Sequence, residues 1–231
     1  MHKGLLLGAV TVLAACSYHP IKTITPVDSE GFWRQGVRFV ESSQNDSVVL
    51  LGYSRYDKIG YVFDAVIRNN SQQPQEFFPT RITCHQFNGS NALIRSTPAV
   101  DPEEKLAQVT RQLQLNQEQP LGLALLSIAD NTASLVDHPD TLEEWDARQE
   151  ENAREDAAEA REQAERLNLE RQRDMYSKEF LRNHSLAPGE TIAGKIVCSG
   201  LTDGTQRLEI EVPIGGVAHK LAWNATLPET L

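Results

Sequence analysis

The hydrophobic positions of the chain change their period twice. In residues 36–100, and again in residues 185–231, apolar and polar side chains alternate with a period of two, which is typical of half-buried β-strands. Turn sequences such as Asn-Asn-Ser and Pro-Gly-Glu separate about seven such runs. Both blocks therefore predict short strands, and an antiparallel β-sandwich would bury one face of each.

The alternation also predicts which side chains point into the core. In the first block the predicted inward residues are Tyr61, Phe63, Ala65 and Ile67, followed by Ile82, Cys84 and Gln86. In the second block they are Leu208, Ile210 and Val212, followed by Val217, His219, Leu221 and Trp223. We interpret His219 as a hydrogen-bonded core histidine rather than a ligand, because its neighbours on this face are apolar.

Between the two blocks, residues 101–184 follow a helical period. Asp101 followed by Pro102 and two glutamates predicts one helix start, and Thr141 followed by Leu-Glu-Glu predicts a second. Pro120 predicts a kink or a new start in the first stretch. That stretch carries an apolar stripe of leucines, and the second carries a narrow seam formed by Ala153, Ala157, Ala160 and Ala164.

Folding these two stretches back on each other at about residue 139 sets large side chains against small ones. The predicted pairs are Leu113 with Ala164, Leu121 with Ala157, and Leu125 with Ala153. We therefore predict an antiparallel helical hairpin, with arms of roughly 50 to 60 Å at 1.5 Å per residue, inserted between the two strand blocks. The predicted fold class is α+β.

Two surfaces of this insertion are candidates for binding. Near the hairpin tip the apolar stripe widens beyond what an Ala-rich partner helix can cover, and Leu123, Leu126 and Val136 are the predicted docking residues. The alternative is that this surface packs on the protein's own sandwich or on a short third helix. Residues 143–174 hold twelve acids, six arginines and no lysine, and pairs such as Glu150 with Arg154 and Glu162 with Arg166 stand at i,i+4. The run indicates a solvated helix face or, alternatively, a site for a basic partner.

The first sixteen residues predict export and attachment to a membrane. A short n-region with Lys3 precedes the apolar run 5–15, which is too short to span a bilayer and ends in Leu-Ala-Ala-Cys. This ending resembles the lipobox of bacterial lipoproteins, which implies that residues 1–15 are a signal peptide and that Cys16 carries the lipid. The alternative is an ordinary secretory signal beside an incidental cysteine. Residues 16–35 are the expected tether.

The residue after the cysteine and the overall charge refine this expectation. Ser17 stands where lipoproteins retained in the inner membrane usually have aspartate, so the resemblance implies the outer membrane. We expect the protein to face the periplasm. The net charge of −10 becomes −11 when Lys3 is removed with the signal, and no Lys/Arg cluster stands out along the 231 residues. Nucleic acid and anionic lipid headgroups are therefore poor candidate ligands.

The two remaining cysteines form an even pair. Cys84 and Cys198 each lie on the apolar side of a predicted strand, and in an oxidising compartment we expect them to form one disulfide. Two buried free thiols are the alternative.

Motifs of catalysis are missing from the sequence. It contains no H-E-x-x-H, G-x-S-x-G, P-loop, S-x-x-K or dinucleotide fingerprint, its histidines lack metal-ligand spacing, and no cofactor is expected. The aromatic pair Phe32-Trp33 and the single Trp145 are expected to pack in the core or as staples, with stacking on carbohydrate or peptide as the alternative.

Three segments carry a resemblance. Tyr61–Ser71, Leu186–Val197 and Leu208–Ile214 resemble uncharacterised bacterial lipoproteins with an immunoglobulin-like domain, where an Asn-rich turn after a strand and a Leu-x-Pro-Gly-Glu strand start recur. The resemblance implies an immunoglobulin-like sandwich and no catalytic residue. We expect a lipid-anchored envelope component that binds an envelope protein or a second copy of itself, with an accessory enzyme acting on envelope glycans or peptides as the alternative.

Overall fold

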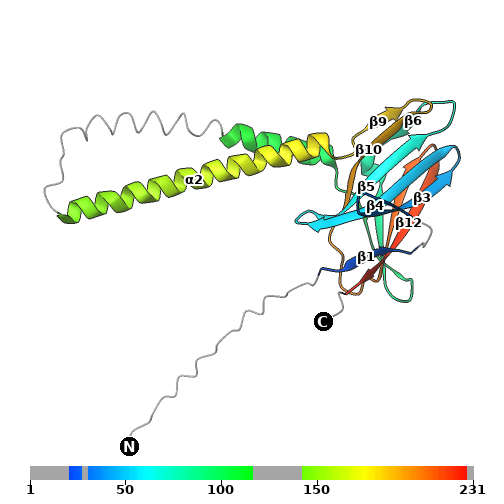
Figure 1. Ribbon diagram of the computed structural model, residues 1–231, viewed down its shortest axis with the longest axis horizontal. Coiled ribbons are helices and arrows are strands. Elements are labelled where there is room, and N and C mark those ends of the chain that lie inside the picture. The colour runs from blue at the N-terminus through cyan, green and yellow to red at the C-terminus, as the bar shows by residue number, and fades with distance from the viewer. Residues whose placement is uncertain (1–20, 28–30, 117–141, 228–231) are drawn as a thin grey trace, which may run out of the picture.

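The chain folds into an all-antiparallel β-body from which helices extend. The structure is a computed structural model that describes residues 21–27, 31–116 and 142–227 (Figure 1). One five-stranded sheet has the order β1 (Thr23–Pro26), β12 (Val217–Thr226), β11 (Arg207–Ile214), β7 (Thr83–Phe87), β8 (Leu93–Pro98). The other has the order β10 (Thr191–Cys198), β5 (Gly60–Asn69), β4 (Ser47–Asp57), β3 (Val37–Gln44), β2 (Phe32–Arg34).

The remaining elements are smaller or helical. Strands β6 (Gln75–Phe77) and β9 (His184–Leu186) form a two-stranded sheet, and a 3-10 turn follows at Pro79–Arg81. Residues 102–116 are α-helical, and α2 (Leu142–Lys178) is the long helix. The predicted α+β class, with antiparallel sheets arranged as a sandwich and helices between two strand blocks, is confirmed at this level.

The two strand blocks are interleaved in one body. Strand β10 pairs with β5, and β11 pairs with β7, so each sheet takes strands from both sides of the helical insertion. A single core cluster contains inward residues of both sheets, and the rings of Phe63 and Trp223 meet across it at 4.8 Å between centroids. The sheets therefore pack face to face, and the insertion does not divide the core.

The predicted inward faces are confirmed. The even positions of β11, beginning with Leu208, are buried while their neighbours are partly exposed, and β7 alternates in the same way around Cys84. Strand β5 departs from simple alternation, because Val62 is buried on the outer face of its sheet as well. The reason is that the helices cover this part of that face.

The expected tether over residues 16–35 differs from the structure. Thr23–Pro26 pairs with β12 as β1, and Phe32–Arg34 pairs with β3 as β2. Ile24 is buried beneath β12, while Pro26 is tolerated because β1 is an edge strand. Runs of three and four residues are too short to give a clear alternation, which is why the sequence did not predict them.

Two of the three segments that carried the family resemblance, Tyr61–Ser71 and Leu186–Val197, meet at one end of the β-body. The buried Asn69 side chain donates hydrogen bonds to the carbonyls of Gln73, Leu186 and Ala187, at 2.8, 3.0 and 3.3 Å. Gly189, with φ of +77°, donates its backbone N–H to the Asn69 carbonyl at 2.8 Å. The Asn-rich turn and the Pro-Gly-Glu turn are therefore two halves of one structural joint.

The β-body has two distinct ends. The tether end contains residues 21–22, the turns at 58–59 and 88–92, the loop 199–206 and the last described residue, Leu227. The far end contains the turns at 45–46 and 215–216 and the joint around Asn69. None of the helices in the described part of the chain is long and apolar enough to cross a membrane.

Candidate functional site

A helical arm leaves the β-body from the outer face of the β10–β5 sheet. Figure 1 shows α2 with its C-terminal end at the body and the rest of its length extending away from it. The helix 102–116 begins where the sequence predicted, because the Asp101 carboxylate accepts the backbone N–H of Glu103 at 2.9 Å. The predicted cap at Thr141 lies outside the described residues.

The base of the arm is a second apolar cluster, separate from the core between the sheets. It joins both helices to the outward side chains of β5 and β10, and we call it the base cluster. Its buried members are Val62, Val109, Leu113, Leu169, Tyr176, Phe180 and Val197. The helices are thus packed on the sheet through their base.

Backbone hydrogen bonds fix both roots of the arm to the edge strand β10. Before the first helix, Val100 donates its N–H to the Val197 carbonyl at 2.9 Å. After α2, Lys195 donates to the Glu179 carbonyl at 2.7 Å and receives a bond from Leu181 at 3.1 Å. Both roots therefore continue the hydrogen bonding of the sheet.

Gly194 permits the second of these approaches. A Cβ atom at this position would lie 2.9 Å from the Leu181 nitrogen and 3.0 Å from the Glu179 carbonyl oxygen. Since both contacts are backbone atoms, a larger residue would push the root of α2 away from β10. The glycine is required by this close approach.

A charged clamp closes the base. The Arg182 guanidinium donates from Nε and Nη2 to the two carboxylate oxygens of Glu103, at 2.6 and 2.7 Å. This hydrogen bond lowers the pKa of Glu103 below its usual value and raises that of Arg182. Nearby, the Lys195 ammonium donates to the Glu179 carboxylate at 2.6 Å. The clamp joins the start of the first helix to the residues that follow α2.

Beyond the base, α2 continues as a long stretch, residues 145–168, which no other element of the described part of the chain covers; we call it the shaft. Every residue of the shaft is exposed, including the alanines of the predicted seam, so the described structure shows no helix covering that seam. Leu113 is buried in the base cluster with Leu169 rather than over Ala164. The other two predicted pairs involve Leu121 and Leu125, which lie outside the described residues.

Local ion pairs line the shaft. Arg154 pairs with Glu150 at 2.8 Å, as its i,i+4 spacing predicted, while Arg166 pairs with Glu170 at 3.2 Å rather than with the expected Glu162. Both pairs are solvent-exposed. They support the helix without fixing it to any other element.

Several predicted site residues are not described by the structure. These are the lipid attachment residue Cys16 and the docking residues Leu123, Leu126 and Val136. Their assignments stay predictions.

The disulfide expected between Cys84 and Cys198 is present. Their sulfurs are 1.99 Å apart, and both residues are fully buried. Because Cys84 lies on β7 and Cys198 on β10, the bond joins the two sheets and also the two strand blocks. Its place in the core gives it a structural role.

His219 is a satisfied core histidine, as predicted. Its Nε2 lies 2.8 Å from the Ser47 hydroxyl, and its Nδ1 lies 3.0 Å from the Ser42 hydroxyl. The Ser47 hydroxyl also lies 2.8 Å from the Gln44 carbonyl, and His219 Nδ1 lies 3.1 Å from the Ser42 carbonyl, so both ring nitrogens have hydrogen-bonding partners. The imidazole and the Ser47 side chain are buried, so this Ser–His contact has no access to a substrate.

The other histidines do not converge. His85 Nδ1 lies 2.8 Å from the Ser96 hydroxyl, and His184 lies 2.8 Å from the Glu190 carboxylate. Across the described ranges, no group of three or more histidines, cysteines or acids is arranged to hold a metal ion. Cys84 and His85 point to opposite sides of β7, because successive side chains of a strand alternate.

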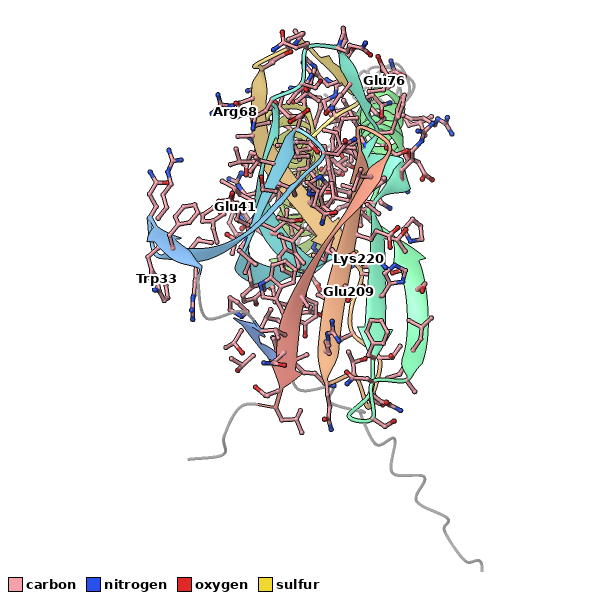
Figure 2. All side chains as sticks on the ribbon, turned by 90° about the vertical axis from the view of Figure 1, so that its right-hand side faces the viewer. Trp33, Glu41, Arg68, Glu76, Glu209 and Lys220 are labelled. Carbon is pink, nitrogen blue, oxygen red and sulfur yellow. A yellow bond between two sulfur atoms is a disulfide. The ribbon has the colours of Figure 1, made fainter. Side chains whose placement is uncertain are left out.

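The aromatic residues expected to pack inside are exposed instead. Figure 2 shows Trp33 projecting from the flank of the β-body on the β2–β3 hairpin, where 70% of the residue is exposed. Phe32 stacks on Phe39 at 5.7 Å, and Trp145 is exposed on the shaft. Phe32 and Trp33 are consecutive in the edge strand β2, so their side chains point to opposite faces of the sheet and cannot both reach the core.

A shallow cavity of about 570 Å³ lies beside this hairpin, between it and the end of α2. Its lining includes Arg34, Asp64, Lys178, Glu179 and Lys195. Charges of both signs therefore surround the cavity, whereas the Trp33 side chain, on the opposite face of β2 from Arg34, is not part of its lining.

Sequence reasoning missed the clamp and the glycine of the base. Glu103 and Arg182 are 79 residues apart, and neither belongs to a recognisable motif.

Comparison with known proteins adds no constraint, since no family model, curated protein or solved structure matches the chain.

Proposed function

We propose that this protein is a lipid-anchored envelope lipoprotein whose helical arm binds an envelope protein. One observation carries the proposal: the base of the arm is fixed to the β-body, whereas the shaft is exposed on every side. Among the described residues no other element covers the shaft, so the packing of the body does not account for the length of this helix.

The geometry suits a docking element. The 27 steps from Leu169 in the base cluster to Leu142 at the start of α2 correspond to about 40 Å of helix at 1.5 Å per residue. The base holds this lever through the hydrogen bonds to β10 and the Glu103–Arg182 clamp. A preorganised lever loses less conformational entropy on binding than a disordered segment would.

The proposed location in the cell envelope rests on the lipobox resemblance and on the disulfide. The inter-sheet disulfide is a feature of proteins that fold in oxidising compartments such as the periplasm. We place the protein on the periplasmic side of the outer membrane, held by lipid on Cys16. The face-to-face sheets with a disulfide between them also support an immunoglobulin-like relationship for the β-body.

In-cell photocrosslinking tests the docking proposal. A benzophenone amino acid replaces Leu126 at the predicted docking site or Leu167 on the shaft, with Glu159 on the charged face as the matched control. We expect a discrete protein adduct at Leu126 or Leu167 and none at Glu159. If all three positions give only intramolecular links, the arm is not a docking element.

A second candidate function is favoured by the exposed Trp33. A solvent-exposed indole on an edge strand presents its ring face for stacking on a sugar ring or peptide bond of the envelope. Titration with soluble peptidoglycan fragments, followed by tryptophan emission, should shift the spectrum of the native protein. The Trp33→Phe variant should give no shift, and an unchanged native spectrum would exclude this function.

A further inference from the structure

The exposed apolar side chains of the β-body are unevenly distributed. Five of them lie at the tether end: Ile21, Tyr56, Leu93, Ile94 and Leu227. Val27, Phe32 and Trp33 lie on the flank, and none of the large apolar residues described at the far end is exposed. The far end carries polar turn residues instead, such as Asn45, Asp46 and Gln72.

Two cavities show that the tether-end residues are neighbours. One, of about 490 Å³, is lined by Ile21, Tyr56, Arg95 and Leu201 among others. The other, of about 560 Å³, is lined by Lys22 and Leu227 among others. Since Ile21 and Lys22 are adjacent in the chain, the two cavities flank the point where the chain enters the body.

The entering segment is held in place on this end. The backbone N–H of Lys22 donates to the Tyr61 hydroxyl at 3.2 Å, and its ammonium donates to the Thr205 carbonyl. Ile24, two residues further, is already buried in the core. The direction from which the chain arrives is therefore fixed by the fold.

Basic residues gather at the same end. Arg55, Lys58 and Arg95 are exposed there, and Lys22 lies among them, against the acids Asp57 and Asp203. Asp57 is partly neutralised by Arg55, whose Nε lies 3.5 Å from it. Among the described residues of this end, these four basic side chains stand against two acids, whereas the chain as a whole carries a net charge of −10. The linear sequence shows no such cluster because these residues come from separate turns.

We propose that the tether end is a membrane-contacting surface that rests on the anionic headgroup region of the bilayer. The inference depends on the proposed lipid anchor in one respect: only four residues lie between Cys16 and Ile21, and the five steps reach at most roughly 18 Å at 3.3 to 3.6 Å per residue. Apolar and tyrosine side chains partition into the interface, and basic side chains attract anionic lipids.

This surface gives the lipid anchor an orientation as well as an attachment. A lipid on a free tether would let the body rotate, whereas contact through the tether end keeps the far end in the aqueous phase.

Photocrosslinking to lipid tests the orientation. The chain from Cys16 to Leu231 is coupled through the Cys16 thiol to maleimide-bearing phosphatidylethanolamine in vesicles that contain phosphatidylglycerol. Cys84 and Cys198 do not compete, because they are buried and bonded to each other. A benzophenone amino acid replaces Leu93 at the tether end or, as the matched control, the exposed Gln72 at the far end.

We expect lipid adducts at Leu93 and almost none at Gln72. Changing Arg55, Lys58 and Arg95 together to glutamine should lower the adduct yield at Leu93 by roughly fivefold or more, because each basic side chain near an anionic surface contributes a factor of about five. Equal yields at the two positions, no lipid adduct at Leu93, or a protein adduct in its place in cells would overturn the proposal.

The outcome is independent of the proposed function. The vesicle experiment supplies the lipid chemically, so its result holds whether or not Cys16 is lipidated in cells. The intact mass of the protein extracted from membranes tests the natural anchor, and crosslinking from Leu126 and Leu167 tests the arm.

Discussion

The β-body and the shaft of α2 are stabilised in opposite ways. In the body, residues distant in sequence form one core, a disulfide spans 114 residues, and Asn69 ties together two remote turns. In the shaft, every residue is exposed and the ion pairs connect residues one helical turn apart. The body therefore depends on tertiary contacts, and the shaft on local helix propensity.

This difference explains why several kinds of contact hold the base of the arm. A helix stabilised only locally frays from its ends unless one end is held, and the base cluster, the bonds to β10 and the charged clamp all act at the same end of α2. This contrast can be tested from both sides. Substitutions in the body should lower its stability and leave the shaft unchanged, whereas substitutions in the shaft should weaken the helix and leave the stability of the body unchanged.

Removal of the disulfide should have the largest effect on the body. Changing Cys84 and Cys198 together to serine opens a loop of 114 residues, and the expected loss in the free energy of unfolding is about 5 kcal/mol in the chain-entropy model. Urea denaturation of the oxidised protein and the variant measures this loss.

Alkylation distinguishes the bond from two buried thiols. The unfolded, unreduced protein should take up reagent at Cys84 and Cys198 only after reduction. Alkylation of both cysteines without reduction would contradict the disulfide.

Loss of the Asn69 amide should have the next largest effect. Asn69→Ala leaves three carbonyl acceptors without their donor at the far end of the body, and we expect a loss of about 3 kcal/mol. The matched control is Asn70→Ala, whose side chain is exposed and whose loss should stay within about 0.5 kcal/mol. Equal effects of the two variants would mean that the joint does not hold the far end together.

The parts of the fold that the sequence predicted are those with a local signal. Alternation around Phe63 and Ile210, the Asp101 cap, the Glu150–Arg154 spacing and the one remaining cysteine pair each involve a pattern that can be read in a short window or by elimination. His219 was predicted correctly because the side chains on its own face are apolar.

The parts that it missed depend on distant partners. Strand β1 exists because Ile24 reaches a core formed mostly by residues from Val40 onward, and four residues carry too little pattern to show it. The Glu103–Arg182 clamp and the basic tether end bring together residues that no spacing rule connects. Trp33 was expected to pack inside, because composition does not reveal that its strand lies at a sheet edge.

Acidification should destabilise the body through His219. Burial lowers the pKa of this imidazole below its ordinary value of 6.5, against a smaller opposing contribution from the hydrogen bond to the Ser42 backbone. The unfolded chain therefore binds a proton near pH 6.5 while the folded chain does not. The contribution to stability is complete above pH 6.5 and declines as the pH falls below it.

Denaturation at pH 7.5 and pH 5.5 measures this dependence. The difference between the two values should be smaller in His219→Gln, which keeps a hydrogen-bonding side chain but does not titrate. His184→Gln serves as the control, since His184 is on the surface and its loss should leave the decline below pH 6.5 in place. A native-like decline in His219→Gln would assign the pH dependence to other groups.

Breaking the clamp should loosen the base with little effect on the body. Arg182→Gln removes a bidentate but partly exposed ion pair, and the expected loss in global stability is about 1 kcal/mol or less. Hydrogen exchange of residues 102–116 and 175–181 should become faster, because these segments meet at the base. Arg154→Gln on the shaft is the control, and it should leave exchange in both segments unchanged.

The smallest effect on the body is expected from the shaft, and it decides whether the comparison is right. Ala157→Gly should weaken the helix locally by about 1 kcal/mol, the difference in helix propensity between the two residues. Because Ala157 contacts no other element in the described structure, the urea midpoint of the body should not move. Ala65→Gly, in the core of β5, is the matched control and should lower that midpoint measurably. A lowered midpoint in Ala157→Gly would mean that the alanine seam is packed against a helix, and the arm would then be part of the folded core rather than a docking element.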